Sequence, residues 1–179
     1  MKQVFIIGSS PRKDGNSDIL CNHFAQGARE AGHEVIQLFL RDRQIACCIA
    51  CDACKRNGGI CAIKDDMAAI LQEMKLADVI VLASPVYFYS VNAQMKAMID
   101  RCVADYLALA DKTFYFIATA AEQDVQALAT TFDCLRGFTD CLPNAHVKGV
   151  IQGHGAWERG DVMHTNALQE AYRMGSKIA

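Results

Sequence analysis

Short apolar runs alternate along the whole chain with stretches whose apolar residues recur at helical spacing, and this alternation restricts the possible folds more than any other feature. Continuous apolar runs at Val4–Ile7, Val79–Ala83 and Phe114–Ala118 are typical of strands buried on both faces. Two further strands are predicted at Val35–Leu40 and Ala145–Ile151. Because a helical pattern follows each run, the sequence predicts an α/β fold with a five-stranded parallel sheet covered by helices on both faces.

The size and charge balance of the chain limit its surroundings and its partners. Its 179 residues, of which 52% are hydrophobic and 21% charged, suffice for one core, and no linker divides them, so we expect a single domain over residues 1–179. Lys and Arg number 18 against 20 Asp and Glu, which gives no electrostatic reason to expect nucleic acid or an anionic membrane as a partner. The apolar runs are too short for a membrane span or a signal peptide, which indicates a cytoplasmic protein.

The loop over residues 8–17 has the composition of a phosphate-binding loop. Ligands of open parallel sheets lie beyond the carboxyl ends of the strands, and this loop leads from the first strand into a helix. It combines hydroxyls, an amide, two cations and the free N–H groups of a helix start, but has neither P-loop nor G-x-G-x-x-G spacing. A terminal phosphate such as that of FMN suits it; a turn followed by an ordinary helix cap is the alternative. The candidate ligands are Ser9, Ser10, Arg12, Asn16 and Ser17.

Two further loops, over residues 84–90 and 119–124, follow strands of the same sheet and are expected at the same edge. Three consecutive aromatic residues in the first loop are expected to cover a flat ligand, their own core or a second subunit. Trp157, in a glycine-rich loop after the last strand, either covers the ligand or holds its own loop. The five histidines show no ligand spacing, and we predict no catalytic side chain.

Cysteine is over-represented and clustered. The chain has nine, an odd number that rules out a fully paired disulfide framework, and five lie within fifteen residues of a cysteine-rich loop over residues 41–64. Cys48, Cys51, Cys54 and Cys61 approximate the cluster-binding run of ferredoxins, whereas zinc sites normally use two separated pairs. The alternative is a loop of free thiols that binds no metal. The cysteines outside the loop are predicted to be small buried apolar residues. They are Cys21, Cys102, Cys134 and Cys141.

The Gly8–Ser17 segment resembles the phosphate loop of the NAD(P)H-dependent FMN reductase family, a branch of the flavodoxin-like fold. The resemblance extends over Ala83–Lys96 and Asp100-Arg101, and the cysteine spacing with Asp65-Asp66-Met67 is similar to the iron–sulfur flavoprotein branch. It implies a flavodoxin-like three-layer sandwich that binds FMN, with the flavin ring between the second and third loops. The residues implied for the ring are Pro85, Val86, Tyr87 and Phe88 on one side and Thr119, Ala120 and Ala121 on the other.

The resemblance also implies an FMN-dependent oxidoreductase that forms a homodimer or tetramer. In one version it transfers electrons from NAD(P)H to a small acceptor such as a quinone or free flavin. In the other version the four clustered cysteines hold a 4Fe–4S cluster beside FMN, and the protein exchanges single electrons with a ferredoxin-like partner. A non-enzymatic electron carrier like a flavodoxin is a third interpretation. Two points argue against it: the charge of the chain is near neutral, and the chain lacks the acidic patch that such carriers use for docking.

Overall fold

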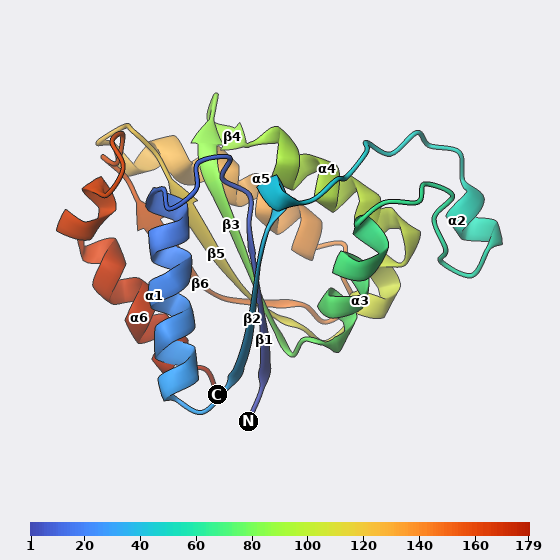
Figure 1. Cartoon of the computed structure of the whole chain (residues 1–179), viewed down its shortest axis with the longest axis horizontal. Helices are drawn as coiled ribbons and strands as arrows, with labels where there is room; N and C mark the ends of the chain where they lie inside the picture. Colours follow the sequence, from blue (N-terminus) through green and yellow to red (C-terminus); the bar gives the residue numbers. More distant parts are fainter.

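The computed structural model describes residues 1–179 and is a three-layer α/β sandwich built on a parallel sheet (Figure 1). The parallel strands are β1 (Gln3–Gly8), β2 (Glu34–Phe39), β3 (Val79–Tyr87), β5 (Thr113–Thr119) and β6 (His146–Gly153). Their spatial order is β2-β1-β3-β5-β6, which is the flavodoxin-like order with its switch point between β1 and β3. The predicted fold class is therefore confirmed.

A sixth strand corrects the prediction of five. β4 (Ser90–Val91) pairs antiparallel with the end of β3, so that Tyr87 faces Ser90 across a two-residue turn. Both turn residues, Phe88 and Tyr89, have positive φ, of 49° and 59°, as such a tight hairpin turn requires. Because these turns usually carry Asn or Gly, the two aromatic residues gave no hairpin signal, and residues 84–90 were expected to be a loop.

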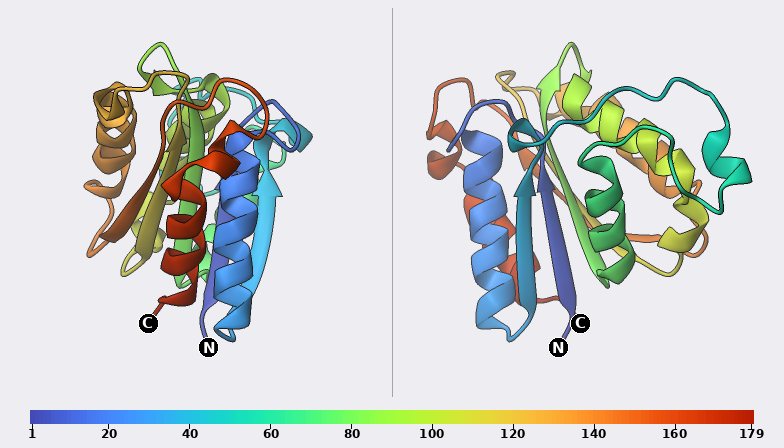
Figure 2. Two further views of the ribbon diagram at one scale, coloured as in Figure 1. Left: turned by 90° about the vertical axis from the view of Figure 1, so that its left-hand side faces the viewer. Right: turned by 45° about the vertical axis from the view of Figure 1, so that its right-hand side comes forward.

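Helices cover both faces of the sheet (Figures 1 and 2). α1 (Asn16–Glu30) and α6 (Asn166–Ser176) cover one face; α3 (Met67–Leu76), α4 (Ala93–Arg101) and α5 (Ala129–Thr139) cover the other. Val4 and Ile6 of β1 are buried against the first pair of helices, and Phe5 and Ile7 against the second group. This two-sided burial is why the strands read as continuous apolar runs.

The contact between α1 and α6 depends on two glycines. A Cβ atom at Gly27 would collide with the carbonyl oxygen of Tyr172, and one at Gly175 would collide with the carbonyl oxygen of Phe24. The two helix backbones can approach this closely only because neither position carries a side chain. The closing helix is thereby held against the helix that begins at the phosphate loop.

α4 is shorter than its apolar stripe predicted. In the sequence, apolar residues recur at helical spacing from Val91 to Tyr106, which predicts one long helix. The α-helix nevertheless ends at Arg101, and Asp105 interrupts the path with φ −156° and ψ 43°. Short 3₁₀ turns keep the apolar side chains at nearly helical spacing beyond that point. The 3₁₀ turns of the chain are η1 (Leu40–Asp42), η2 (Cys102–Ala104), η3 (Tyr106–Leu109), η4 (Val125–Leu128) and η5 (Asp161–His164).

Residues 47–61, here called the cysteine segment, leave the sandwich on the side of α3 and α4 (Figures 1 and 2). Their regular structure is one helical turn, α2 (Ala53–Arg56). Ala50 and Asp52 have positive φ, of 51° and 54°, so the backbone adopts the left-handed conformation at two positions just before that turn. None of the helices in the chain is both long enough and apolar enough to cross a membrane.

Candidate active site

The phosphate loop, residues 8–17, presents unpaired N–H groups at the switch point of the sheet. α1 begins after Gly15 without a side-chain cap, so the expected capping role of Asn16 or Ser17 is not seen. The backbone N–H groups of Asn16, Ser17 and Asp18 have no acceptor within the protein. Together with the dipole of a fifteen-residue helix, these donors form a site for an anion.

Two serine side chains of the phosphate loop bind neighbouring strands. Ser9 Oγ donates to the carbonyl oxygen of Ala83 at 3.0 Å, and Ser17 Oγ lies 2.7 Å from Thr119 Oγ1. Asn92 Nδ2, at the start of α4, donates to the carbonyl oxygen of Ser9 at 2.6 Å. These hydroxyls fix the loop on β3 and β5, while the unpaired backbone N–H groups of the loop remain available for a ligand.

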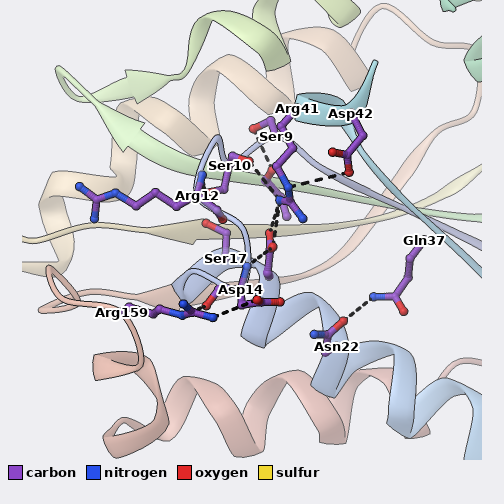
Figure 3. Close-up of polar contacts among 12 residues, drawn as sticks. Ser9, Ser10, Arg12, Asp14, Ser17, Asn22, Gln37, Arg41, Asp42 and Arg159 are labelled. Carbon is purple, nitrogen blue, oxygen red and sulfur yellow. Dashed lines mark hydrogen bonds and ion pairs between the residues drawn. The ribbon is translucent and has the colours of Figure 1, made fainter.

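A buried ion pair supports the loop from the β2 side. Arg41, just beyond β2, donates from Nη1 to the carbonyl oxygen of Ser10 at 3.2 Å and lies 2.9 Å from Asp18 Oδ2 (Figure 3). Burial raises the pKa of Asp18, and this effect outweighs the hydrogen bond and charge of Arg41. Sequence reasoning missed both residues, although Arg41 follows the carboxyl end of the strand beside β1.

The loop after β6, residues 153–160, is joined to the phosphate loop by Asn16. Asn16 Nδ2 donates to the carbonyl oxygens of Ala156 at 3.1 Å and Glu158 at 2.8 Å, and its Oδ1 accepts from the N–H of Gly160 at 3.0 Å. Arg159 donates to Asp14 Oδ2 at 2.9 Å (Figure 3). The side chain of Asn16 therefore holds two loops together, and only its backbone N–H stays available for a phosphate.

Arg12 lies against Trp157 in the same pair of loops. Its Nη1 donates to the carbonyl oxygen of Trp157 at 3.2 Å, and its guanidinium carbon lies 5.7 Å from the centroid of the indole ring. Trp157 is 63% exposed, so it is not packed into the core. In Figure 3 the Arg12 side chain extends away from Arg41, and it places a cation at the edge of the cleft.

A narrow cleft of about 90 Å³ runs between these loops and brings most of the predicted cofactor residues together. Gly15, Ala156 and Trp157 line it as well. Two predicted residues do not line the cleft: Ser9 is buried beneath the phosphate loop, and Phe88 is fully exposed on the hairpin. The predicted residues along the cleft are Ser10, Arg12, Asn16, Ser17, Pro85, Val86, Tyr87, Thr119, Ala120 and Ala121.

The hairpin beside the cleft exposes three aromatic side chains. Tyr87 is 44% exposed, Tyr89 is 59% exposed and Phe88 is fully exposed. Thr130 of α5 donates its hydroxyl to the carbonyl oxygen of Tyr89, which holds the hairpin on the sandwich. A cluster of exposed aromatic side chains next to a cleft is typical of a surface that stacks on a ligand or a partner.

All nine cysteines are free, and their surroundings differ. Within the cysteine segment, Cys48 and Cys51 are exposed, whereas Cys54 and Cys61 are half-buried. The N–H of Ala50 donates to Cys48 Sγ at 3.4 Å, so the backbone already turns around this sulfur. In this conformation the thiols do not gather with other ligands into a group of three or more around one point.

The cysteines outside the segment divide into two kinds. Cys21 and Cys102 are buried as predicted, and burial raises the pKa of the Cys102 thiol to about 12. Cys134 is half-buried and Cys141 is exposed, so the prediction of burial was wrong for these two. Cys134, on α5, packs partly against the core, whereas Cys141 lies beyond the end of that helix.

The family model of the NADPH-dependent FMN reductases matches residues 1–141. The chain belongs to this family. The "Iron-sulfur flavoprotein MJ1083" of Methanocaldococcus jannaschii is 42% identical over 190 residues, covering 99% of this chain and 95% of the relative. An iron–sulfur flavoprotein of Methanosarcina thermophila is 40% identical over 97 residues, which cover 54% of this chain and 50% of the relative. The predicted membership, including the iron–sulfur flavoprotein branch, is thereby confirmed.

Solved structures agree with the fold. An FMN-dependent NADH-azoreductase of Bacillus anthracis in complex with FMN superposes with a TM-score of 0.74 at 16% identity, covering 99% of each chain. An NAD(P)H:quinone oxidoreductase of Methanothermobacter marburgensis superposes with a TM-score of 0.73 at 16% identity, covering 98% of this chain and 96% of that one. At such low sequence identity, these superpositions establish the flavodoxin-like fold alone. The family membership establishes FMN-dependent oxidoreduction.

The residues present fit FMN. Its phosphate requires several N–H donors and a cation, and the first turn of α1 supplies three unpaired N–H groups beside Arg12. The small side chains of Ala120 and Ala121 let a flat ring approach the backbone at the other end of the cleft. No carboxylate or imidazole lines the cleft, in keeping with chemistry that the cofactor itself performs.

Proposed function

We propose that this FMN-dependent oxidoreductase works as an iron–sulfur flavoprotein, in which Cys48, Cys51, Cys54 and Cys61 hold a 4Fe–4S cluster and electrons are exchanged with a ferredoxin-like partner. The observation that carries the proposal is a set of four free thiols on one exposed segment, in a chain whose core uses other cysteines. Thiolate sulfur is the ligand that such clusters require, and the N–H donor at Cys48 is of the kind that tunes a cluster potential. The whole-length similarity to an iron–sulfur flavoprotein supports it.

The residues of the cleft orient the flavin. We infer that the first-turn N–H groups of α1 and Arg12 hold the phosphate, while Pro85–Tyr87 and Thr119–Ala121 flank the ring. When bound, FMN takes up electrons in pairs and releases them singly. The contribution of this chain is to fix the position of the ring and to limit the access of water.

A second candidate function is reduction of a small acceptor, such as a quinone or free flavin, with NAD(P)H as the electron donor. The specific observation in its favour is the open cleft beside three exposed aromatic side chains, which offer a stacking surface to a nicotinamide or a quinone. A volume of about 90 Å³ is well below the roughly 300–1,000 Å³ of a pocket that encloses a small molecule. The cleft therefore does not enclose a small molecule, and the exposed aromatic side chains at its edge are where a second molecule would approach the ring.

The same openness supports a homodimer or tetramer in which a second copy covers the aromatic hairpin. Monomers rarely leave three neighbouring aromatic side chains in water. Clustered reduced thiols also favour the reducing cytoplasm as the compartment. Light scattering at low micromolar concentration should give at least twice the mass of the chain, and a monomer with full flavin occupancy would contradict this assembly.

Metal and flavin analysis of the anaerobically purified protein tests the main proposal. We expect one FMN, four iron and four sulfide per chain, with a broad absorbance near 400 nm beneath the flavin bands. A protein with FMN but without iron and sulfide would eliminate the cluster and leave the second candidate. Zinc in place of iron would likewise contradict a redox role for the cysteines. Steady-state oxidation of NADH and NADPH with quinone or flavin as acceptor then tests the second candidate.

A further inference from the structure

One buried arginine joins the two ends of the cysteine segment. Arg101, the last residue of α4, is 2% exposed. Its Nη1 donates to the carbonyl oxygen of Ala46 at 2.8 Å, and its Nη2 donates to that of Ile63 at 3.5 Å. Ala46 directly precedes the segment and Ile63 follows it by two residues. A single guanidinium therefore bridges the chain where it enters and where it leaves the segment.

Asp65 completes this bridge. It accepts from Arg101 Nη1 at 2.6 Å and from Arg101 Nη2 at 3.0 Å, a bidentate pair in which both side chains are at most one-tenth exposed. The same carboxylate accepts from the N–H of Ala46 at 2.9 Å and from that of Met67 at 3.1 Å. The carboxylate and its partner thus hold the entering chain, the leaving chain and the start of α3 together.

A neighbouring pair of contacts repeats the connection one step farther from the segment. Asp66 Oδ2 accepts from the N–H of Gln44 at 2.7 Å, and the N–H of Asp66 donates to the carbonyl oxygen of Gln44 at 3.1 Å. Inside the segment the polar contacts are local, such as the exposed pair of Lys55 and Asp52. The side-chain hydrogen bonds that join the segment to the sandwich are therefore concentrated at its base.

The other end of α4 contacts the flavin loops. Asn92 caps α4: its Oδ1 accepts from the N–H of Met95. Its Nδ2 donates to the carbonyl oxygen of Ser9, and its backbone N–H donates to Ser84 Oγ at 3.1 Å. α4 is nine residues long, about 13 Å at a rise of roughly 1.5 Å per residue. In Figure 1 it runs from the β4 hairpin toward the side on which α2 projects. One rigid helix therefore connects the phosphate loop to the base of the cysteine segment.

The guanidinium also faces the segment itself. Arg101, Asp65 and Cys61 line one cavity of about 430 Å³, together with Lys64 and Lys75. Arg101 Nε is buried and has no acceptor. A buried donor without a partner is unusual, and beside a thiol that faces the same cavity it supplies a hydrogen bond and a positive charge for a sulfur ligand.

We propose that Arg101 and Asp65 are positioning residues that hold the cysteine segment at a fixed place relative to the flavin loops, with α4 as the rigid connection between them. The pair acts through the backbone of Ala46 and Ile63 and contacts neither the flavin cleft nor the exposed thiols. Any effect of this pair on an iron–sulfur cluster rests on the proposed function. The role of the pair in fixing the segment does not depend on a cluster.

Hydrogen–deuterium exchange of the FMN-bound protein tests the fixing of the segment. In Arg101→Lys, which keeps the charge but loses the bidentate contact, and in Asp65→Asn, which keeps the shape, we expect residues 44–64 to exchange about tenfold faster or more. Exchange in residues 3–30 should stay as in the parent. Unchanged exchange in residues 44–64 in both variants would overturn the proposal. Should either variant fail to fold, Asp66→Ala removes one acceptor of the same base, and a smaller acceleration confined to residues 44–64 is the expected result.

The ratio of iron to flavin separates positioning from general stability. Arg101→Lys should lower iron per chain about fivefold or more while FMN occupancy is retained. Arg41→Lys, the matched change beneath the phosphate loop, should lower FMN occupancy and spare iron. Equal losses of iron and FMN in Arg101→Lys would overturn the positioning role. If the parent itself holds no iron, the proposed cluster fails, and the exchange experiment alone decides whether the segment is fixed by this pair.

Discussion

The phosphate loop and the cysteine segment follow neighbouring parallel strands, and each has a buried arginine–aspartate pair beside it, yet the fold holds them in different ways. Ser9 and Ser17 of the phosphate loop are buried and bonded to β3 and β5. The cysteine segment lies outside the sandwich, and Arg101 and Asp65 hold it at its base. The first region is preorganised for its ligand by the sheet, whereas the second leaves its thiols free to close around whatever they bind.

The two buried carboxylates reflect this difference. Burial raises the pKa of Asp18, because Arg41 compensates for only part of the lost hydration. Burial also acts to raise the pKa of Asp65, but the hydrogen bonds from Arg101 and from the N–H groups of Ala46 and Met67 outweigh it, and the pKa lies below its ordinary value. The carboxylate at the base of the cysteine segment is therefore the better compensated of the two.

The largest expected effect is on the contents of the cysteine segment. Cys51→Ser should abolish bound iron and sulfide, because a 4Fe–4S cluster needs all four thiolates, while the flavin stays bound in its separate cleft. Iron, sulfide and flavin analysis with a visible spectrum measures this. Cys141→Ser, an exposed thiol outside the segment, is the matched control and should match the parent. Retention of iron in Cys51→Ser would contradict the proposal that the cysteine segment holds the cluster.

In the phosphate loop, Arg12→Ala should weaken FMN binding by about 1.5–3 kcal/mol, the range for a hydrogen bond to a charged group. Titration of apoprotein by quenching of flavin fluorescence gives the dissociation constant. Arg136→Ala, in an exposed pair with Asp133 on α5, is the control and should bind FMN as the parent does. An unchanged dissociation constant in Arg12→Ala would mean that the backbone N–H groups hold the phosphate without the guanidinium.

Trp157→Ala tests the contact between the phosphate loop and the loop after β6. A cation–π contact at an exposed site is worth about 0.5–1 kcal/mol, so FMN should bind roughly two- to fivefold more weakly as Arg12 loses its position. The same fluorescence titration measures it. Trp157→Phe keeps an aromatic face and should recover part of the loss; a Phe variant as weak as the Ala variant would argue against a role for the ring.

Acid should loosen the cysteine segment before the phosphate loop. A carboxylate whose folded-state pKa is lowered stabilises the fold above its unfolded pKa of about 3.9, and this contribution is lost as the pH falls below that value. Asp18, whose folded-state pKa is raised, has the opposite sign: protonation relieves its cost as the pH falls. Hydrogen exchange between pH 5 and pH 3, corrected for its intrinsic pH dependence, should accelerate first in residues 44–64. Asp65→Asn should lack this acceleration, and earlier loosening of residues 8–17 would contradict the prediction.

Much of the fold could be predicted because its signals are local. The apolar runs located the five parallel strands to within a few residues, and the hydroxyl-rich loop located the helix start with its free N–H groups. The β4 hairpin could not be predicted, because Phe88 and Tyr89 occupy positive-φ positions that Asn and Gly normally fill. The end of α4 at Arg101 was missed since 3₁₀ turns preserve the apolar spacing of a helix.

Side-chain roles were less predictable than positions. Asn16 was expected to bind phosphate, but its amide joins the loop after β6, a partner 140 residues away. The role of Arg41 carried no local signal, and Arg101 was noted only as part of the family resemblance, because each acts through a carboxylate and backbone carbonyls that the fold brings beside it. The exposure of Cys141 was likewise not predictable from helical spacing, because this residue lies just beyond the end of α5.

The sequence by itself determined the alternation of strands and helices, the phosphate loop and the spacing of four thiols, because each depends on residues close together in the chain. Only the tertiary structure decided which loops meet at the cleft, which strands the serines of the phosphate loop bond to, and that one helix connects the phosphate loop to the cysteine segment. The physical reason is that buried polar groups must find partners, and the order of strands in the sheet, which no local pattern encodes, decides which partners are within reach.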